Sequence, residues 1–164
     1  MDIKHRIKYY DSDTALSGQI NAVIRYKNGC LEMDYIDSEG RKGKLISDSS
    51  YDLLWSLNDV YRNLGCEILC IGLLSNVYPG GLTSESTFQI AAYQIEPENR
   101  LKRKVNIFDE IDVTDIKHKS SKENQRITRE NVLSEYDVGK FSLEEVMVKP
   151  GNEKVKNILG KYLN

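Results

Sequence analysis

Apolar and polar residues alternate on both sides of Asn28-Gly29, a dipeptide typical of tight two-residue hairpin turns. Pairing Lys27 with Cys30 fixes a register in which three pairs share one face: Tyr26 with Leu31, Ile24 with Met33, and Ala22 with Tyr35. The same register sets Arg25 opposite Glu32 on the other face, a favourable cross-strand charge pair. Because the two patterns agree, the sequence predicts this hairpin.

The next segments predict a third strand, a helix and a buried strand. A turn at Ser38-Glu39-Gly40 predicts a returning strand over residues 42–46. The stretch 50–64 has apolar residues at helical spacing, a hydroxyl cap at Ser49-Ser50 and a stop at Gly65, so it predicts an amphipathic helix. Residues 67–74 are almost continuously apolar, which indicates the central strand of a sheet, buried on both faces.

Two more strands are predicted over 87–95 and 104–108, joined across 97–100. Residues 112–126 are polar, and the stretch 117–122 has no apolar periodicity, so we expect an exposed loop or a frayed helix end there. A capping box at 142–145 and an apolar stripe over 155–163 predict C-terminal helices. The chain is therefore expected to form one α+β domain over residues 1–164, with these helices packed on an antiparallel or mixed sheet.

Composition narrows the functional classes. The chain has 164 residues, a formal net charge of -2 and a pI near 5.8, so it has no overall basic field to attract nucleic acid or anionic lipid. Its longest apolar stretch, 68–74, is too short to span a bilayer. Three cysteines and the lack of a signal-peptide pattern predict a cytoplasmic protein with free thiols.

Motifs for metals and phosphates are missing from the sequence. The two histidines, His5 and His118, stand in no zinc-binding spacing, and Asp11-Ser12-Asp13 lacks the later ligands of a calcium loop. Gly80-Gly81 has no following Lys-Ser or Lys-Thr to hold a phosphate, and we expect a tight loop there. No cofactor is therefore expected.

Cys66 and Cys70 lie four residues apart on a predicted strand. That spacing places their side chains on one face and about 13 Å apart, too far to share a metal, so we expect core residues. Pairing one of them with His118 as nucleophile and base is the weaker alternative. We accordingly predict no catalytic residue.

Two charged clusters are candidates for binding. Four carboxylates occur within seven residues: Asp109, Glu110, Asp112 and Asp115. They indicate a solvated strand end, a magnesium site or a contact for a basic partner. The second cluster is basic: Arg100, Lys102, Arg103 and Lys104. It is suited to phosphate contacts, although cations on a hairpin more often protect an edge strand from aggregation.

A distinctive series of residues runs from Gly65 to Phe108: Ile68-Leu69-Cys70-x-Gly72, then Asn76-Val77-Tyr78-Pro79-Gly80-Gly81-Leu82, then Ala92-Tyr93, then Val105-x-Ile107-Phe108. In this series, about a quarter of the chain, the sequence resembles a family of small bacterial proteins of unassigned function, some of them associated with toxin-immunity neighbourhoods. The family's turn reads Pro-Ser-Gly-Met where this chain has residues 79–82. The resemblance implies no catalytic residues.

Three functional hypotheses follow. The leading one is a non-enzymatic, cytoplasmic immunity or antitoxin-like protein that binds and neutralises a cognate toxin, with a contact formed by Asp109, Glu110, Asp112, Asp115 and an exposed aromatic at Tyr78. The alternative is a small metal-assisted enzyme that uses the same carboxylates as ligands. The third is a nucleic-acid-binding protein that works through residues 100–104.

Overall fold

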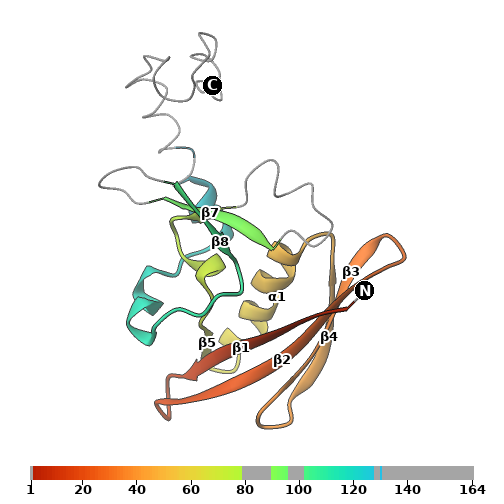
Figure 1. The fold of residues 1–164 in the computed structure, drawn as a ribbon. Helices are drawn as coiled ribbons and strands as arrows, with labels where there is room; N and C mark the ends of the chain where they lie inside the picture. Colours follow the sequence, from red (N-terminus) through yellow and green to blue (C-terminus); the bar gives the residue numbers. More distant parts are fainter. Residues whose placement is uncertain (1, 79–89, 96–101, 128–129, 131–164) are drawn as a thin grey trace, which may run out of the picture.

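A curled antiparallel sheet that wraps around one helix dominates the computed structural model, which describes residues 2–78, 90–95, 102–127 and 130. The sheet has five strands in the order β4-β3-β2-β1-β5, and a smaller sheet has the order β6-β7-β8 (Figure 1). The larger sheet consists of β1 (Asp2–Asp11), β2 (Leu16–Lys27), β3 (Cys30–Asp37), β4 (Lys42–Ser47) and β5 (Cys66–Ile68). The smaller sheet consists of β6 (Val77–Tyr78), β7 (Ala91–Ile95) and β8 (Lys102–Asn106). The fold therefore belongs to the predicted α+β class.

The hairpin of β2 and β3 has the predicted register. Lys27 pairs with Cys30 and Arg25 pairs with Glu32, across a turn in which Asn28 and Gly29 both have positive φ. The charge pairing differs from the prediction, because the Arg25 guanidinium bonds to Asp34, two residues further along β3 on the same face, and to Asp2 on β1. Glu32 instead accepts a hydrogen bond from Lys44 Nζ on β4 at 3.0 Å. These contacts link β1, β2, β3 and β4 across the outer face of the sheet.

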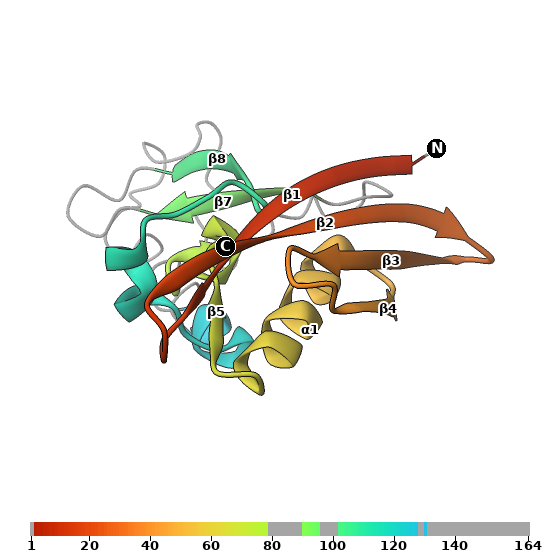
Figure 2. The ribbon, with the colours of Figure 1, turned by 90° about the horizontal axis from the view of Figure 1, so that it is seen from below.

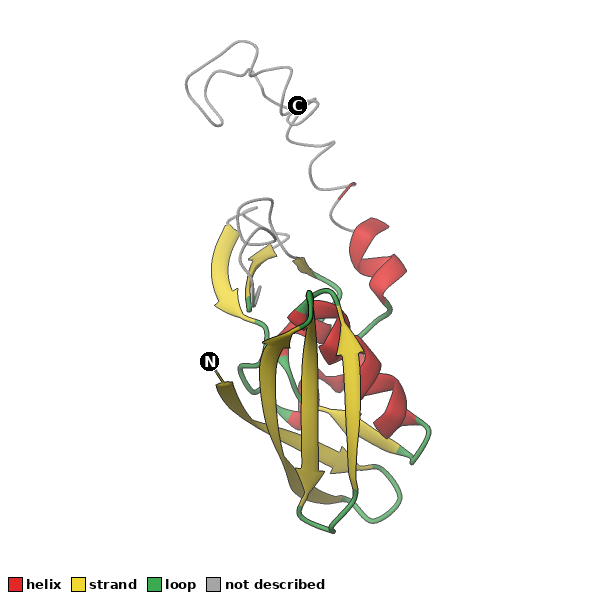
Figure 3. Ribbon diagram, turned by 90° about the vertical axis from the view of Figure 1, so that its right-hand side faces the viewer, coloured by secondary structure: helices red, strands yellow, loops and turns green. Residues whose placement is uncertain are grey.

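Helix α1 (Ser50–Arg62) lies inside the curl of the sheet (Figures 2 and 3). The Ser49 hydroxyl accepts a hydrogen bond from the Asp52 amide at 3.1 Å, which confirms the predicted cap. The buried face of the helix packs on apolar residues of the sheet; its fully buried apolar residues are Leu53, Leu54, Leu57 and Tyr61. Gly65 has the expected positive φ of 78° just beyond the helix. None of the described helices is long and apolar enough to cross a membrane.

The predicted central strand over 67–74 is wrong, although its burial is right. Strand β5 covers only Cys66–Ile68 and lies at the edge of the larger sheet, and the chain then forms a short 3₁₀ helix, η1 (Ile71–Leu73). At Gly72 an added Cβ would lie 2.7 Å from Ile107 Cβ and 2.9 Å from Leu54 Cδ2, so the segment is buried between α1 and the residues after β8. An apolar run records burial and does not by itself distinguish a strand from other buried backbone.

The later strands agree only in part with the prediction: β7 lies within 87–95, but β8 is shifted to 102–106, and residues 107–108, predicted as strand, form a turn. β7 and β8 pair antiparallel, with Ala92 opposite Val105 and Tyr93 opposite Lys104. The predicted strand residues 87–89, the connection at 97–100 and the C-terminal helices over 142–145 and 155–163 lie outside the described residues. So does the expected tight loop at Gly80-Gly81.

The polar segment after residue 112 only partly matches the exposed loop or frayed helix end that we expected over 117–122, where residues 117, 118, 121 and 122 are exposed. It forms a second 3₁₀ helix, η2 (Val113–His118), and residues 122–127 are helical. Between them the Lys119 side chain is only 1% exposed. Its ammonium donates to Glu67 Oε1 at 2.7 Å, to Asn58 Oδ1 at 2.8 Å and to the Ile68 carbonyl at 2.9 Å. Burial lowers the pKa of Lys119, and the bond to Glu67 opposes that shift.

Gln125 attaches the helical residues 122–127 to the core. It is 1% exposed, and its Nε2 donates to the carbonyls of Gly72 at 2.8 Å and Leu74 at 2.5 Å. Its Oε1 accepts from Trp55 Nε1 at 3.3 Å and from the Tyr51 hydroxyl. Both donors and both lone pairs of the amide are therefore used, so this polar side chain is buried without an unpaired group.

Asp37 joins the turn between β3 and β4 to helix α1. Its side chain is fully buried and accepts hydrogen bonds from Arg41 Nε and the Tyr61 hydroxyl, both at 2.7 Å, and from the amides of Glu39 and Arg41. Burial on its own raises the pKa of Asp37, but these donors together hold that pKa below its usual value. The Arg41 guanidinium also lies 5.5 Å from the ring centroids of Tyr9 and Tyr61.

Removing the Asp37 carboxylate should destabilise the fold. We expect Asp37→Asn to lower the free energy of unfolding by about 2 kcal/mol, because an amide cannot accept from all four donors. Tyr61→Phe, which removes one of those donors, should cost about 1 kcal/mol alone and less when Asp37→Asn is already present. Urea unfolding measures both values, with the exposed Tyr26→Phe as the control. If the stability losses of Asp37→Asn and Tyr61→Phe were additive in the double variant, the hydrogen bond between Asp37 and Tyr61 would be contradicted.

Lys119 offers a second test of the fold. Lys119→Met keeps most of the aliphatic stem but leaves Glu67, Asn58 and the Ile68 carbonyl without their donor, so we expect a loss of about 3 kcal/mol in the free energy of unfolding. The exposed neighbour Lys117 provides the control, and Lys117→Met should change stability by less than about 0.5 kcal/mol. Similar effects of the two substitutions would show that Lys119 is not held as described.

Candidate functional site

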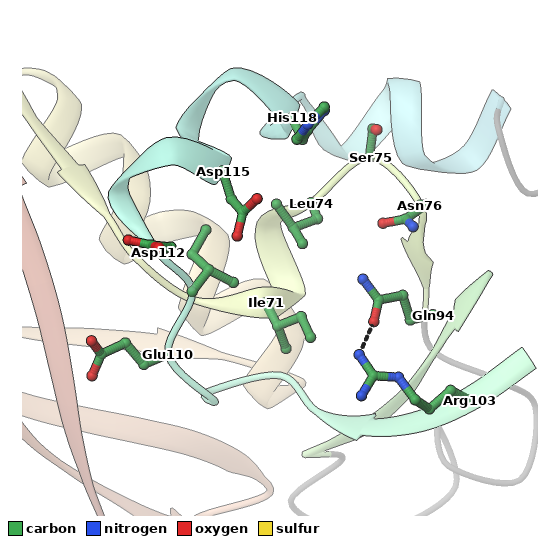
Figure 4. A pocket seen from close by; sticks show the side chains of 11 residues that line it. Ile71, Leu74, Ser75, Asn76, Gln94, Arg103, Glu110, Asp112, Asp115 and His118 are labelled. Carbon is green, nitrogen blue, oxygen red and sulfur yellow. Dashed lines mark hydrogen bonds between the residues drawn. The ribbon is translucent and has the colours of Figure 1, made fainter. Parts of the chain in front are cut away.

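A cavity of about 510 Å³ lies beside the acidic cluster, between η1, η2 and the smaller sheet (Figure 4). Its apolar lining comes from Ile71, Leu74 and Ile111. Polar side chains from β7, β8, η2 and the segments next to them complete the lining. The volume lies within the range of about 300–1,000 Å³ usual for sites that bind small molecules.

Backbone hydrogen bonds fix the acidic segment in place. The Ile71 amide donates to the Asp109 carbonyl at 2.8 Å, and the Ile111 amide donates to the Leu69 carbonyl at 3.3 Å. Between these bonds, Cys70 and Glu110 form an isolated antiparallel bridge. The segment therefore runs alongside the chain that follows β5, and its carboxylates project from an ordered backbone.

The four predicted carboxylates come together at one edge but point in different directions. The Asp115 carboxylate points into the cavity, whereas the carboxylates of Glu110 and Asp112 point away from Gln94 and Arg103 on the opposite wall (Figure 4). Glu110 Oε2 accepts from Lys8 Nζ at 3.3 Å, and Asp112 Oδ1 accepts from the Val113 amide at 2.9 Å and so caps η2. Asp109 is exposed and is not part of the cavity lining.

The opposite wall contains residues that the sequence did not single out as a group. Arg103 donates a hydrogen bond to Gln94 Oε1, and the Gln94 amide nitrogen and the guanidinium are both directed into the cavity (Figure 4). Asn76 Nδ2 donates to the Ile95 carbonyl at 2.7 Å, which leaves its Oδ1 facing the cavity. Arg103 had been assigned to a possible phosphate contact, and His118 to a weak pairing with cysteine. Only the pairing of β7 with β8 places Gln94 and Arg103 together, opposite Asp115, whereas His118 lies on η2 with Asp115.

Tyr78 is not the exposed aromatic that we predicted. It is 7% exposed, and its ring centroid lies 6.2 Å from that of Tyr93 on the neighbouring strand. The strand β6 has only two residues, both buried, so Tyr78 contributes to packing in the smaller sheet. Of the basic cluster, Arg103 and Lys104 are exposed on β8, while Arg100 and the side chain of Lys102 lie outside the described residues.

The geometry gives no support to a thiol nucleophile. Cys66 and Cys70 are both buried, as expected for core residues. Burial raises the pKa of Cys70 to about 12 and also raises the pKa of Cys66, which disfavours the reactive thiolate. Within the described part of the chain, no three His, Cys, Asp or Glu residues lie close enough to hold a metal ion.

Comparison with known proteins adds no identity: no family model and no curated protein matches the chain. The resemblance over residues 65–108 therefore stays a prediction. The geometry itself shows two features: the carboxylates of Glu110 and Asp112 point away from the cavity, and the cavity has Asp115 on one wall and Arg103 on the other.

His5 connects β1 to Phe108, the residue just before the acidic segment. Its ring stacks on Phe108, with centroids 4.0 Å apart and an interplanar angle of 23°. Its Nε2 is buried and has no hydrogen-bond partner among the described residues. Burial accordingly lowers the pKa of His5, because the protonated ring would carry a charge in an apolar contact.

This partly buried imidazole should make stability depend on pH. Because the folded-state pKa of His5 lies below its unfolded value of 6.5, the unfolded chain binds more protons, and stability should fall as the pH drops below 6.5. His5→Phe keeps the stacking and removes the proton site, so it should lose less stability than the wild type between pH 7 and pH 5.5. Urea unfolding at the two pH values measures this loss of stability for each protein. The control His118→Asn removes the other imidazole and should lose as much stability as the wild type. Parallel losses in wild type and His5→Phe would contradict the assignment.

Proposed function

We propose that this chain is a non-enzymatic binding protein of the immunity or antitoxin type, which works in the cytoplasm and neutralises a cognate toxin. The observation that carries the proposal is the acidic edge, defined as Asp109, Glu110, Asp112 and Asp115 on an ordered backbone. Among the described residues only Glu110 of this edge forms an ion pair with a cation. The other three carboxylates of the edge have no ion-pair partner among the described residues, in a chain whose net charge is only -2.

An ordered acidic edge is suited to binding a basic protein. Asp109 and Asp112 are exposed, and the hydrogen bonds of Ile71 and Ile111 hold the backbone that carries them. A partner therefore meets carboxylates whose backbone is already ordered, which lowers the entropic cost of association. Complementary charge also speeds the encounter and orients the two proteins, more than it raises affinity.

The toxin part of the proposal rests on that charge and on the resemblance over residues 65–108. A toxin that acts on nucleic acid needs a basic surface to bind its substrate. An inhibitor that covers this surface must be acidic where it makes contact, as this edge is. Blocking by occupancy needs no reactive group on the inhibitor, and burial raises the pKa values of Cys66 and Cys70, which disfavours their thiolate forms.

Partner capture tests the proposal when it is combined with a variant of the edge. We expect the tagged wild-type chain to retain a protein from its host lysate that Asp109→Lys/Asp112→Asn retains poorly. Asparagine at 112 still caps η2, so the second change removes charge and keeps the local structure. The captured protein, expressed alone, should arrest growth, and co-expression of the wild-type chain should restore it.

The matched control is Asp48→Lys/Asp59→Asn, which makes the same change in net charge at exposed carboxylates outside the acidic edge. This control should bind like the wild type. For the purified pair, the edge variant should reduce the association rate about tenfold or more at low salt and have less effect at high salt. The proposal fails if edge and control variants behave alike, or if the captured protein is harmless when it is expressed alone.

A further inference from the structure

The cavity beside the acidic edge has one wall of negative charge and one of positive charge. Asp115, on η2, points into the cavity from one side. Arg103 on β8 and Gln94 on β7 face it from the other side; they lie nine residues apart in sequence but are paired in the smaller sheet. We propose that this cavity binds a small zwitterion, a molecule with an ammonium group at one end and a carboxylate at the other.

The positive wall suits a carboxylate. The Arg103 guanidinium donates one hydrogen bond to Gln94 Oε1, and that bond orients it towards the cavity. Its remaining N–H groups and the Gln94 amide nitrogen are donors directed at the same space. Arg103 forms no ion pair with any carboxylate in the described part of the chain. A ligand carboxylate would supply the missing partner through charge-assisted hydrogen bonds.

The negative wall suits an ammonium. Asp115 is partly buried, and its carboxylate accepts no hydrogen bond from the described residues, unlike that of Asp112, which caps η2. A ligand ammonium would supply the missing donor through a charge-assisted hydrogen bond. Asn76 Oδ1 also faces the cavity, but from the wall that carries Gln94 and Arg103.

The layout distinguishes a zwitterion from simpler ligands. A ligand with only a negative charge would bind Arg103 but would be repelled by Asp115. A ligand with only a positive charge would bind Asp115 but would be repelled by Arg103. Ile71 and Leu74 supply an apolar surface for the carbon chain between the two charged ends. Asp115 belongs to both the acidic edge and the cavity, but the toxin proposal is tested at Asp109 and Asp112 and this inference at Asp115 and Arg103, so either can fail without the other.

Calorimetry with defined zwitterions tests the inference on the full chain. The probes are β-alanine, γ-aminobutyrate and glycylglycine, whose charged groups are increasingly far apart. N-acetylglycylglycine lacks the cation and glycylglycinamide lacks the carboxylate. We expect at least one zwitterion to bind at millimolar concentration and to shift the NMR signals of the Gln94 side-chain amide. If glycylglycine is that ligand, each singly charged analogue should bind about tenfold more weakly.

Variants locate the site. Asp115→Asn and Arg103→Gln should each weaken binding about tenfold. The controls, Asp59→Asn and Lys104→Gln, change exposed residues outside the cavity lining, and Lys104 is the neighbour of Arg103 on β8. They should bind as the wild type does. The inference is overturned if no zwitterion binds, if the singly charged analogues bind equally well, or if Asp115→Asn and Arg103→Gln bind like the controls.

Discussion

The position of the acidic segment depends on the burial of one ammonium group. Lys119 Nζ is removed from water and donates to three acceptors, on α1, on β5 and in the β5 backbone. A buried cation with fewer partners would be costly, so the chain around it has little freedom to move away. Gln125 is likewise a buried polar side chain whose hydrogen bonds are all made within the core, and these bonds join α1 to η1. Together they hold η2, and with it Asp115, against the core.

The same segment presents two different surfaces because its carboxylates diverge. Asp109 and Asp112 face outwards, while Asp115 turns towards Arg103 and Gln94 on the smaller sheet. The 3₁₀ geometry of η2, capped by Asp112, produces this divergence within a few residues. The proposed protein contact and the proposed small-molecule site therefore lie next to each other. Substitutions at Asp109 and Asp112 test the first, and substitutions at Asp115 and Arg103 test the second.

The inner face of the larger sheet shows how local rules combine into a curled fold. The rings of Tyr9 and Tyr35 each lie over a glycine of the neighbouring strand, Gly18 and Gly43, where any added side chain would collide with them. Both rings then pack near Tyr61 of α1, at centroid distances of 5.3 and 6.2 Å. Aromatic residues placed over strand glycines are one way in which sheets accommodate strong curvature.

The sequence by itself determined the elements whose signals are local: the hairpin at Asn28-Gly29 with its register, the cap at Ser49 and the burial of residues 67–74. It also located the four carboxylates of the acidic edge. Tertiary structure alone decided that Lys119 is buried, that Tyr78 is covered and that Arg103 faces Asp115. The sequence signals of turns and caps depend on neighbouring residues. The environment of a long polar side chain depends instead on partners that are distant in sequence. Hydrophobic periodicity carries no information about those partners.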